Sequence, residues 1–120
     1  YANNTYVTVG DSGTILTSSD GTTWDNRTSG TSNGLKGVNY GKSTFVVVGE
    51  SGTILTSFDG ASWTSRTSGT SNDLWGVAFA NNTFVVVGTS GTILTSSDAT
   101  TWDERTSGTT NTLWGVTYSQ

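Results

Sequence analysis

Short apolar stretches recur along the chain, separated by polar turns. In the second half of the sequence, four of them occupy residues 74–79, 83–88, 91–97 and 101–106, with the sequences LWGVAF, TFVVVG, GTILTSS and TWDERT. They are rich in β-branched and aromatic residues and are bounded by Gly, Asn, Ser and Asp, which is typical of strands joined by hairpins. No apolar period of 3.6 residues occurs, so we expect essentially no helix.

The valines of the second stretch indicate how the strands pack. A strand with one exposed face alternates apolar and polar residues, whereas residues 46–48 and 85–87 are uninterrupted valine. We therefore expect both faces of these strands to be buried, as in a small sheet that lies between two further sheets.

The same pattern returns with a period of 39 residues and without gaps. The repeats are 1–39, 40–78 and 79–117, and residues 118–120 open a fourth register. The first and third repeats agree at 29 of 39 positions, and each agrees with the second at 25. Four strands in a repeat of about 40 residues are typical of one β-propeller blade. The sequence therefore predicts an all-β fold, a β-propeller with three four-stranded blades per chain.

Three blades cannot close a propeller ring, and the order of the strands indicates how closure would occur. The chain begins with a second strand at residues 5–10 and ends with a first strand at 113–118. Each final strand would pair with the opening strand of another copy, because an unpaired strand edge is a template for pairing. We expect a homo-oligomer, a trimer with nine blades in preference to a dimer with six. An eight-bladed ring with one blade left unpaired stays open as an alternative.

One acidic turn is written three times, at the hairpin between the third and fourth strands. Its copies are TSSDGTTW from Thr17, TSFDGASW from Thr56 and TSSDATTW from Thr95. The turn resembles the Asp-box (BNR) motif of sialidases and other β-propellers, with one residue fewer before the glycine and with Ala99 replacing that glycine in the third copy. We expect a structural turn, in which a carboxylate accepts backbone N–H bonds and a tryptophan packs beneath it. The turn residues are Ser18, Asp20, Gly21, Trp24, Ser57, Asp59, Gly60, Trp63, Ser96, Asp98 and Trp102.

Two tryptophans on the first strand are the candidates for ligand stacking. Trp75 and Trp114 each follow a leucine, and Lys36 stands at the equivalent position of the first repeat. An aromatic lining that stacks sugars would make the chain a lectin. Packing between blades is the alternative that the sequence favours.

The composition narrows the function further. The net charge is −4 with only five basic residues, so we expect no nucleic-acid partner, because a phosphate backbone requires a basic surface. No run of about 20 apolar residues occurs, so we expect no membrane span. His and Cys are absent and the acids repeat without converging, so we expect no enzymatic activity, no cofactor and no metal site. We recognise no targeting signal and expect a soluble protein, whose compartment the sequence leaves open.

The residue types that are missing from the sequence give a further indication of its origin. There is no Cys, His, Met or Pro in 120 residues, and the repeats are nearly identical. In these respects the chain resembles computationally designed symmetric β-propellers of the Cake and Scone type, built from Asp-box-like blades. The resemblance implies a designed or structural self-assembling scaffold without a natural substrate. The alternative is a carbohydrate-binding or protein-binding Asp-box propeller akin to photosystem II assembly factors.

Overall fold

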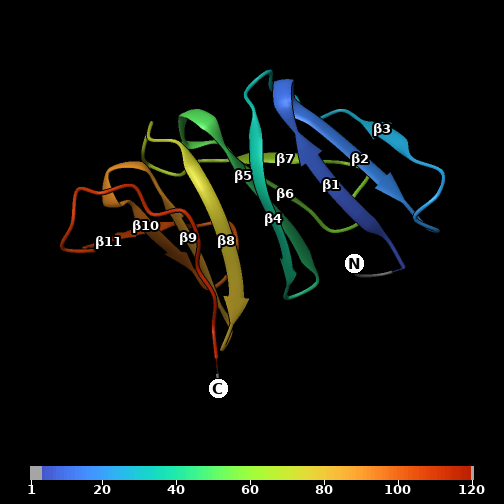
Figure 1. Ribbon diagram of the computed structural model, residues 1–120. Helices are drawn as coiled ribbons and strands as arrows, with labels where there is room; N and C mark the ends of the chain where they lie inside the picture. Colours follow the sequence, from blue (N-terminus) through green and yellow to red (C-terminus); the bar gives the residue numbers. More distant parts are fainter. Residues whose placement is uncertain (1–3, 120) are drawn as a thin grey trace.

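Eleven short strands and three single-turn 3₁₀ helices make up residues 4–119, the part of the chain that the computed structural model describes (Figure 1). Residues 1–3, at the start of the first repeat, and Gln120, in the fourth register, lie outside it. The strands form three antiparallel sheets, each from strands consecutive in the chain. The expectation of an all-β fold is confirmed. The expectation of three four-stranded sheets is wrong for the first sheet, because no first strand pairs with β1 among residues 4–119.

The first sheet has three strands and the other two have four. The first sheet has the order β1 (Tyr6–Gly10), β2 (Thr14–Ser18) and β3 (Asp25–Arg27). The second has the order β4 (Leu35–Gly41), β5 (Thr44–Gly49), β6 (Ile54–Ser57) and β7 (Thr64–Arg66). The third has the order β8 (Leu74–Ala80), β9 (Thr83–Gly88), β10 (Ile93–Ser96) and β11 (Asp103–Arg105).

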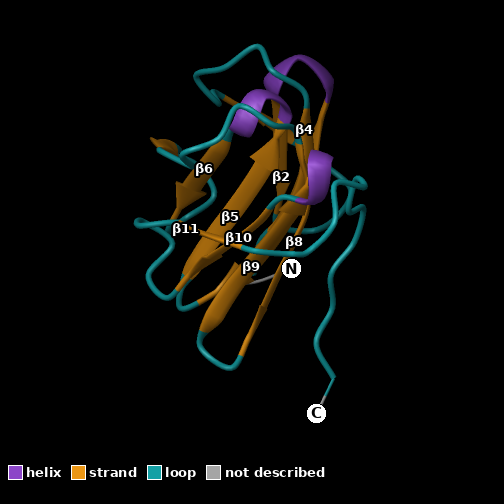
Figure 2. Cartoon of the chain, turned by 90° about the vertical axis from the view of Figure 1, so that its left-hand side faces the viewer, coloured by secondary structure: helices purple, strands orange, loops and turns teal. Residues whose placement is uncertain are grey.

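The expectation of essentially no helix is wrong at one recurring place, the connection between β1 and β2 and the equivalent connections between β5 and β6 and between β9 and β10. Single 3₁₀ turns stand there, η1 (Asp11–Gly13), η2 (Glu50–Gly52) and η3 (Thr89–Gly91), and they gather at one end of the array (Figure 2). Their central serines have positive φ, as does the glycine that follows each of them. The chain reverses within three residues here, so the third strand begins at Ile93 rather than at residue 91.

The valine runs lie in the core, as expected, with one exception. Val46, Val47 and Val48 have no exposed surface, and Val46 packs in a cluster with residues of the third sheet while Val47 packs with Ile15 of the first. Val85 is only partly buried. It has the register of Val46, so it faces the side of the third sheet that no further sheet covers. Burial on both faces therefore requires a neighbour on both sides.

The last part of the chain corrects a second expectation. Residues 113–118 form no strand, although they lie along β8 (Figure 1). The Leu113 N–H donates to the Gly88 carbonyl at 2.9 Å. The segment thus occupies the place of a first strand, but no second strand among residues 4–119 pairs with it, and a ladder needs two strands.

Helices that could cross a membrane are absent from residues 4–119, where each helical turn has only three residues.

Candidate functional site

The acidic turn between β2 and β3 is held by its own hydrogen bonds. The Asp20 carboxylate accepts the N–H groups of Thr22 at 2.8 Å and of Thr23 at 2.9 Å. The Ser18 hydroxyl donates to the same carboxylate oxygen at 3.0 Å and accepts the Gly21 N–H at 2.8 Å. These bonds stay within the turn. Asp20 therefore pairs with backbone N–H groups that have no acceptor in the ladder between the strands.

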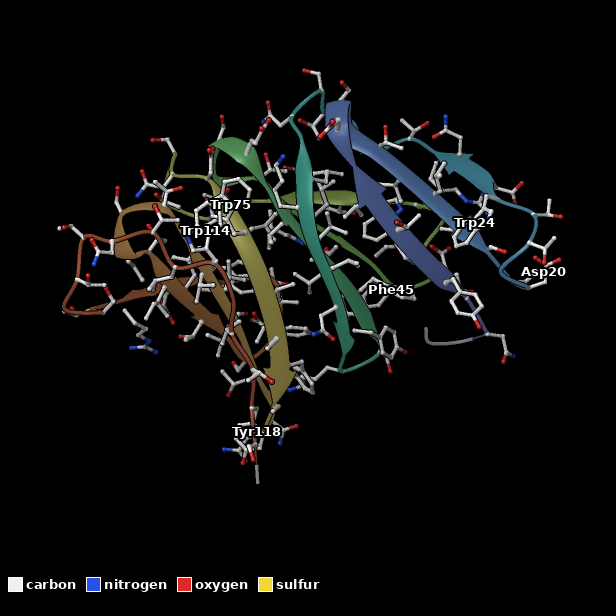
Figure 3. The ribbon with its side chains drawn as sticks, in the orientation of Figure 1. Asp20, Trp24, Phe45, Trp75, Trp114 and Tyr118 are labelled. Atoms are coloured by element: carbon white, nitrogen blue, oxygen red, sulfur yellow. The ribbon has the colours of Figure 1, made fainter. Side chains whose placement is uncertain are left out.

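The other two copies repeat this geometry around Asp59 and Asp98. Beneath them, the indole N–H of Trp63 donates to the Gly60 carbonyl at 2.9 Å, and that of Trp102 donates to the Ala99 carbonyl at 3.2 Å. The structure thus places the predicted Ser and Asp of each turn together in one hairpin and places the three hairpins in different sheets. Trp24 departs from the expectation that a tryptophan packs beneath the turn, because its side chain is 40% exposed. Asp20 and Trp24 lie far from Trp75 and Trp114 (Figure 3).

The residue at the tip of the hairpin adopts positive φ in each copy. Gly21 has a φ of 78° and Gly60 of 80°, while Ala99 has 66° and is buried. A β-carbon is costly in this region of backbone space, so glycine is the natural choice. Ala99 fits because its methyl group packs in the core of the third sheet.

Hydrogen bonding sets the acidity of the three turn carboxylates. Backbone N–H bonds, from Thr23 first and then Thr22, hold the pKa of Asp20 below its usual value. The equivalent bonds lower the pKa of Asp59 and Asp98. These bonds stabilise the ionised carboxylates, whereas a general acid needs a carboxyl group that is protonated near neutral pH.

Acidification is therefore expected to destabilise the fold. Because the folded-state pKa values are depressed, the contribution of these carboxylates is present above the unfolded-state pKa of about 4 and is lost as the pH falls through the lower folded-state values. The thermal unfolding midpoint should drop as the pH is lowered below about 4. The drop should be smaller in the triple variant D20N/D59N/D98N, whose amides do not titrate. If the unfolding midpoints of the two proteins depended equally on pH, the turn carboxylates would not contribute to the acid destabilisation.

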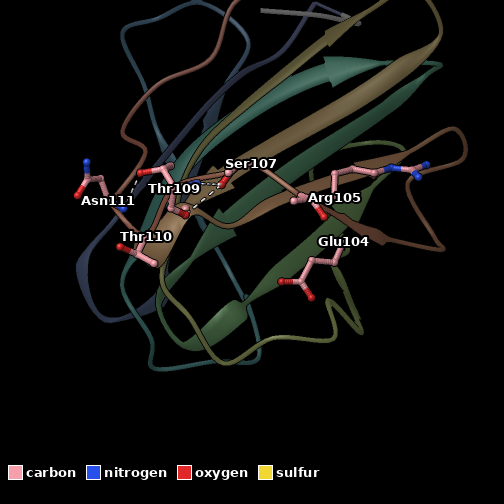
Figure 4. Close-up of a pocket in the computed structure, with 9 residues that line it drawn as sticks. Glu104, Arg105, Ser107, Thr109, Thr110 and Asn111 are labelled. Atoms are coloured by element: carbon pink, nitrogen blue, oxygen red, sulfur yellow. Dashed lines mark hydrogen bonds between the residues drawn. The ribbon is translucent and has the colours of Figure 1, made fainter.

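The hollow shown in Figure 4 lies on the open side of the third sheet. Gly91 and residues 104–111 line it, and the Ser107 hydroxyl donates to the Thr109 carbonyl at 3.2 Å. The equivalent loop of the first repeat faces the second sheet, where the Asn33 side chain donates to the Thr53 hydroxyl at 3.0 Å. The hollow is therefore a surface that a following sheet covers elsewhere in the chain. No cluster of three or more acidic side chains in residues 4–119 is arranged to hold a metal ion.

The two candidate stacking residues lie side by side but differ in accessibility. The rings of Trp75 and Trp114 are 4.7 Å apart between centroids, and the Lys36 ammonium lies 5.4 Å from the Trp75 ring (Figure 3). The Trp75 indole N–H donates to the Thr89 hydroxyl at 3.2 Å. Trp75 therefore packs between blades, whereas Trp114 is 66% exposed.

Close contacts between first strands reveal a feature that the sequence analysis missed. A methyl group on Gly37 would lie 3.2 Å from the Trp75 carbonyl oxygen, and one on Gly76 would lie 3.3 Å from that of Trp114. The equivalent Gly115 has open space around it. A side chain at Gly37 or Gly76 would therefore crowd the neighbouring first strand, whereas no described residue takes that neighbouring place at Gly115.

Near the other end of the chain, at Gly10, there is a matching open space beside the end of β1. A methyl group on Gly49 would lie 3.0 Å from the Leu35 α-carbon, and one on Gly88 would lie 3.1 Å from that of Leu74. The equivalent Gly10, at the end of β1, again has open space around it. In the second and third sheets the crowding comes from a first strand, and residues 4–119 supply no such strand to the first sheet. The recurrence of these glycines in each repeat was the signal available in the sequence.

Comparisons with known proteins support the fold. No protein-family model matches the sequence, and no curated protein matches it. Among solved structures, the chain is similar to one described as YCF48 bound to D1 peptide, with a TM-score of 0.69 and 22% identity over 82% of this chain. The match covers 34% of that structure's chain, so the present chain spans about a third of its length. That neighbour is a β-propeller, and the three sheets therefore have the fold of propeller blades.

Proposed function

We propose that the chain is a self-assembling structural unit of a β-propeller, which closes its ring with further copies of itself and has no catalytic activity. The observation that carries the proposal is the match between its two open ends. Among residues 4–119, no first strand lies beside Gly10 in the first sheet, and the segment around Gly115 lies in the place of a first strand with no sheet of its own. Joining the two ends of different copies completes a four-stranded sheet.

The repeat specifies the register of this joint. Val46 of β5 lies opposite Asn39 of β4, and Val85 of β9 lies opposite Ala78 of β8. Shifted by one repeat, the same pairing sets Val7 of β1 opposite Thr117 of another copy. Antiparallel pairing of this kind satisfies the backbone groups of both segments and removes two exposed edges.

The ring we propose is a trimer with nine blades. Its support is the resemblance of the sequence to designed symmetric propellers with nine blades. A scaffold of this kind, designed or structural, needs no substrate, and the acids of the repeated turns are used in holding hairpins.

Disulfide cross-linking tests the joint directly, because the chain has no native cysteine. In V7C/T117C the paired α-carbons should lie about 5 Å apart, within the range that a disulfide spans. Oxidation should then convert the protein to covalent multimers on a non-reducing gel. The control T8C/T117C places the first cysteine on the opposite face of β1 and should stay uncross-linked. Monomer bands alone in oxidised V7C/T117C would contradict the joint.

Peptide binding is a second candidate function, favoured by the structural neighbour that was solved with a D1 peptide. Titration of that peptide into the assembled protein tests it, and saturable binding that a scrambled peptide does not reproduce would support it. The geometry favours a lectin less, because Trp75 is covered by Lys36 and Trp114.

A further inference from the structure

One donor–acceptor contact recurs at the start of the first strand in each complete sheet. In the second sheet the Lys36 ammonium lies 3.7 Å from the Glu50 carboxylate. In the third sheet the Trp75 indole N–H donates to the Thr89 hydroxyl at 3.2 Å. In both sheets the donor stands on the first strand and the acceptor opens the 3₁₀ turn, 14 residues further along the chain. The contact therefore ties the first strand to the turn that follows the second.

The donor and the acceptor of the remaining contact stand at opposite ends of the chain. Trp114 holds the donor position and its side chain is 66% exposed. Asp11, the first residue of η1, holds the acceptor position, and its side chain is 97% exposed. The carboxylate of Asp11 also lies 3.9 Å from the Lys36 ammonium of the second sheet.

We infer that the indole N–H of Trp114 donates to the Asp11 carboxylate of a second copy when the ring closes. This inference rests on the self-assembly proposed above and names the side chains that recognise the partner. A carboxylate is a stronger acceptor than the hydroxyl of Thr89, because the bond is charge-assisted. Lys36 of the second copy lies 3.9 Å from the same carboxylate, so the joint has a donor on either side of Asp11.

The contact also explains why the repeats differ at these positions. The acceptors are Asp11, Glu50 and Thr89, and the donors are Lys36, Trp75 and Trp114. Glu50 and Thr89 are engaged within the chain. Among the described residues, Asp11 alone of the three acceptors stands in a sheet without a first strand, so the third blade of one copy meets the first blade of the next.

A double-mutant cycle tests the pair in the intact protein. W114F removes the N–H and keeps an aromatic ring, and D11A removes the acceptor. Each variant should raise the concentration at which the assembly dissociates by about tenfold, as expected for one charge-assisted bond. The double variant should be no weaker than the more affected single variant, because both changes remove the same bond. D11A also removes the contact between Asp11 and Lys36. That loss does not affect the coupling energy, because it occurs equally when D11A is introduced into the wild type and into W114F.

Asp25 supplies the matched control. It is an exposed carboxylate on the outer strand β3, 3.8 Å from Arg27, and D25A should leave assembly unchanged. If dissociation of the assembly is too slow to measure, hydrogen exchange of the Trp114 indole proton provides a second readout. The indole N–H signal of Trp114, assigned by its absence in W114F, should exchange slowly in the wild type and quickly in D11A.

The outcomes separate this inference from the proposed function. Suppose that the wild type assembles, and that D11A raises the dissociation concentration by the same factor in the W114F protein as in the wild type. The Trp114–Asp11 contact is then wrong, and self-assembly stands. If D11A has no effect on assembly or on the exchange of the indole proton, the contact is equally wrong. If the wild type remains a monomer at all concentrations, the proposed function fails and this inference fails with it.

Discussion

Gly52→Ala is expected to lower the free energy of unfolding by about 4 kcal/mol, a large share of the stability of a domain of this size. Gly52 is buried at the end of η2 and has a φ of +71°. A β-carbon there would overlap the backbone carbonyl oxygen of Thr70 and lie 2.8 Å from the Ser68 hydroxyl. Backbone cannot rotate away as a side chain can, so the hairpin or the loop must move. Chemical denaturation of the variant measures the loss.

Gly69→Ala is the matched control for this change. Gly69 has a φ of +85°, and nothing lies within 4 Å of the position that its β-carbon would take. The substitution therefore carries the backbone strain without the overlap and should cost about 1 kcal/mol. Comparable losses in the two variants would show that the close approach of residues 68–70 to the 3₁₀ turn does not constrain the fold.

Gly115→Leu is expected to leave the folded chain intact and to abolish its assembly. Within the chain nothing lies within 4 Å of a β-carbon at Gly115, so the side chain has room in the monomer. At the equivalent Gly76, the Trp114 carbonyl oxygen would be 3.3 Å and the Gly115 α-carbon 3.6 Å from such an atom. A leucine would therefore hold the next copy's first strand away. Sedimentation should report single chains for the variant, with an unchanged far-ultraviolet circular dichroism spectrum.

Thr22→Leu controls for the added apolar bulk in that experiment. Thr22 is exposed in the turn between β2 and β3, and its N–H bond to Asp20 involves only its backbone. The particle mass of the Thr22→Leu variant in solution should equal that of the wild-type assembly. An assembly that survives Gly115→Leu unchanged would mean that the first strands of neighbouring copies do not approach as β4 and β8 do.

The sequence predicted the strands well because their signals are local. Residues 83–88 were expected as a strand and form β9 within the same limits. The hairpin chemistry around Asp20 is equally local, since donor and acceptor lie within a few residues of each other. The 3₁₀ turns escaped prediction because a single turn of helix has no apolar period, and only the pairs of positive φ in Ser-Gly mark them.

Properties that depend on neighbours could not be predicted from one repeat. Val46 and Val85 have the same local sequence, yet only Val46 is fully buried, because a further sheet covers it. Residues 113–118 have the pattern of β8 but form no strand, since their ladder partner is missing from the described chain. The exposure of Trp114 was likewise not predictable, because a first-strand tryptophan is covered in one repeat and exposed in the next.

The mass of the particle in solution tests the central claim most directly. Native mass spectrometry or sedimentation at micromolar concentration should give 37.5 kDa, three times the chain mass of 12.5 kDa. A particle of 25 kDa, two times 12.5 kDa, would keep ring closure by self-assembly but contradict the nine-bladed trimer. A stable monomer of 12.5 kDa would contradict the account as a whole, because the proposed joint between copies would then not form.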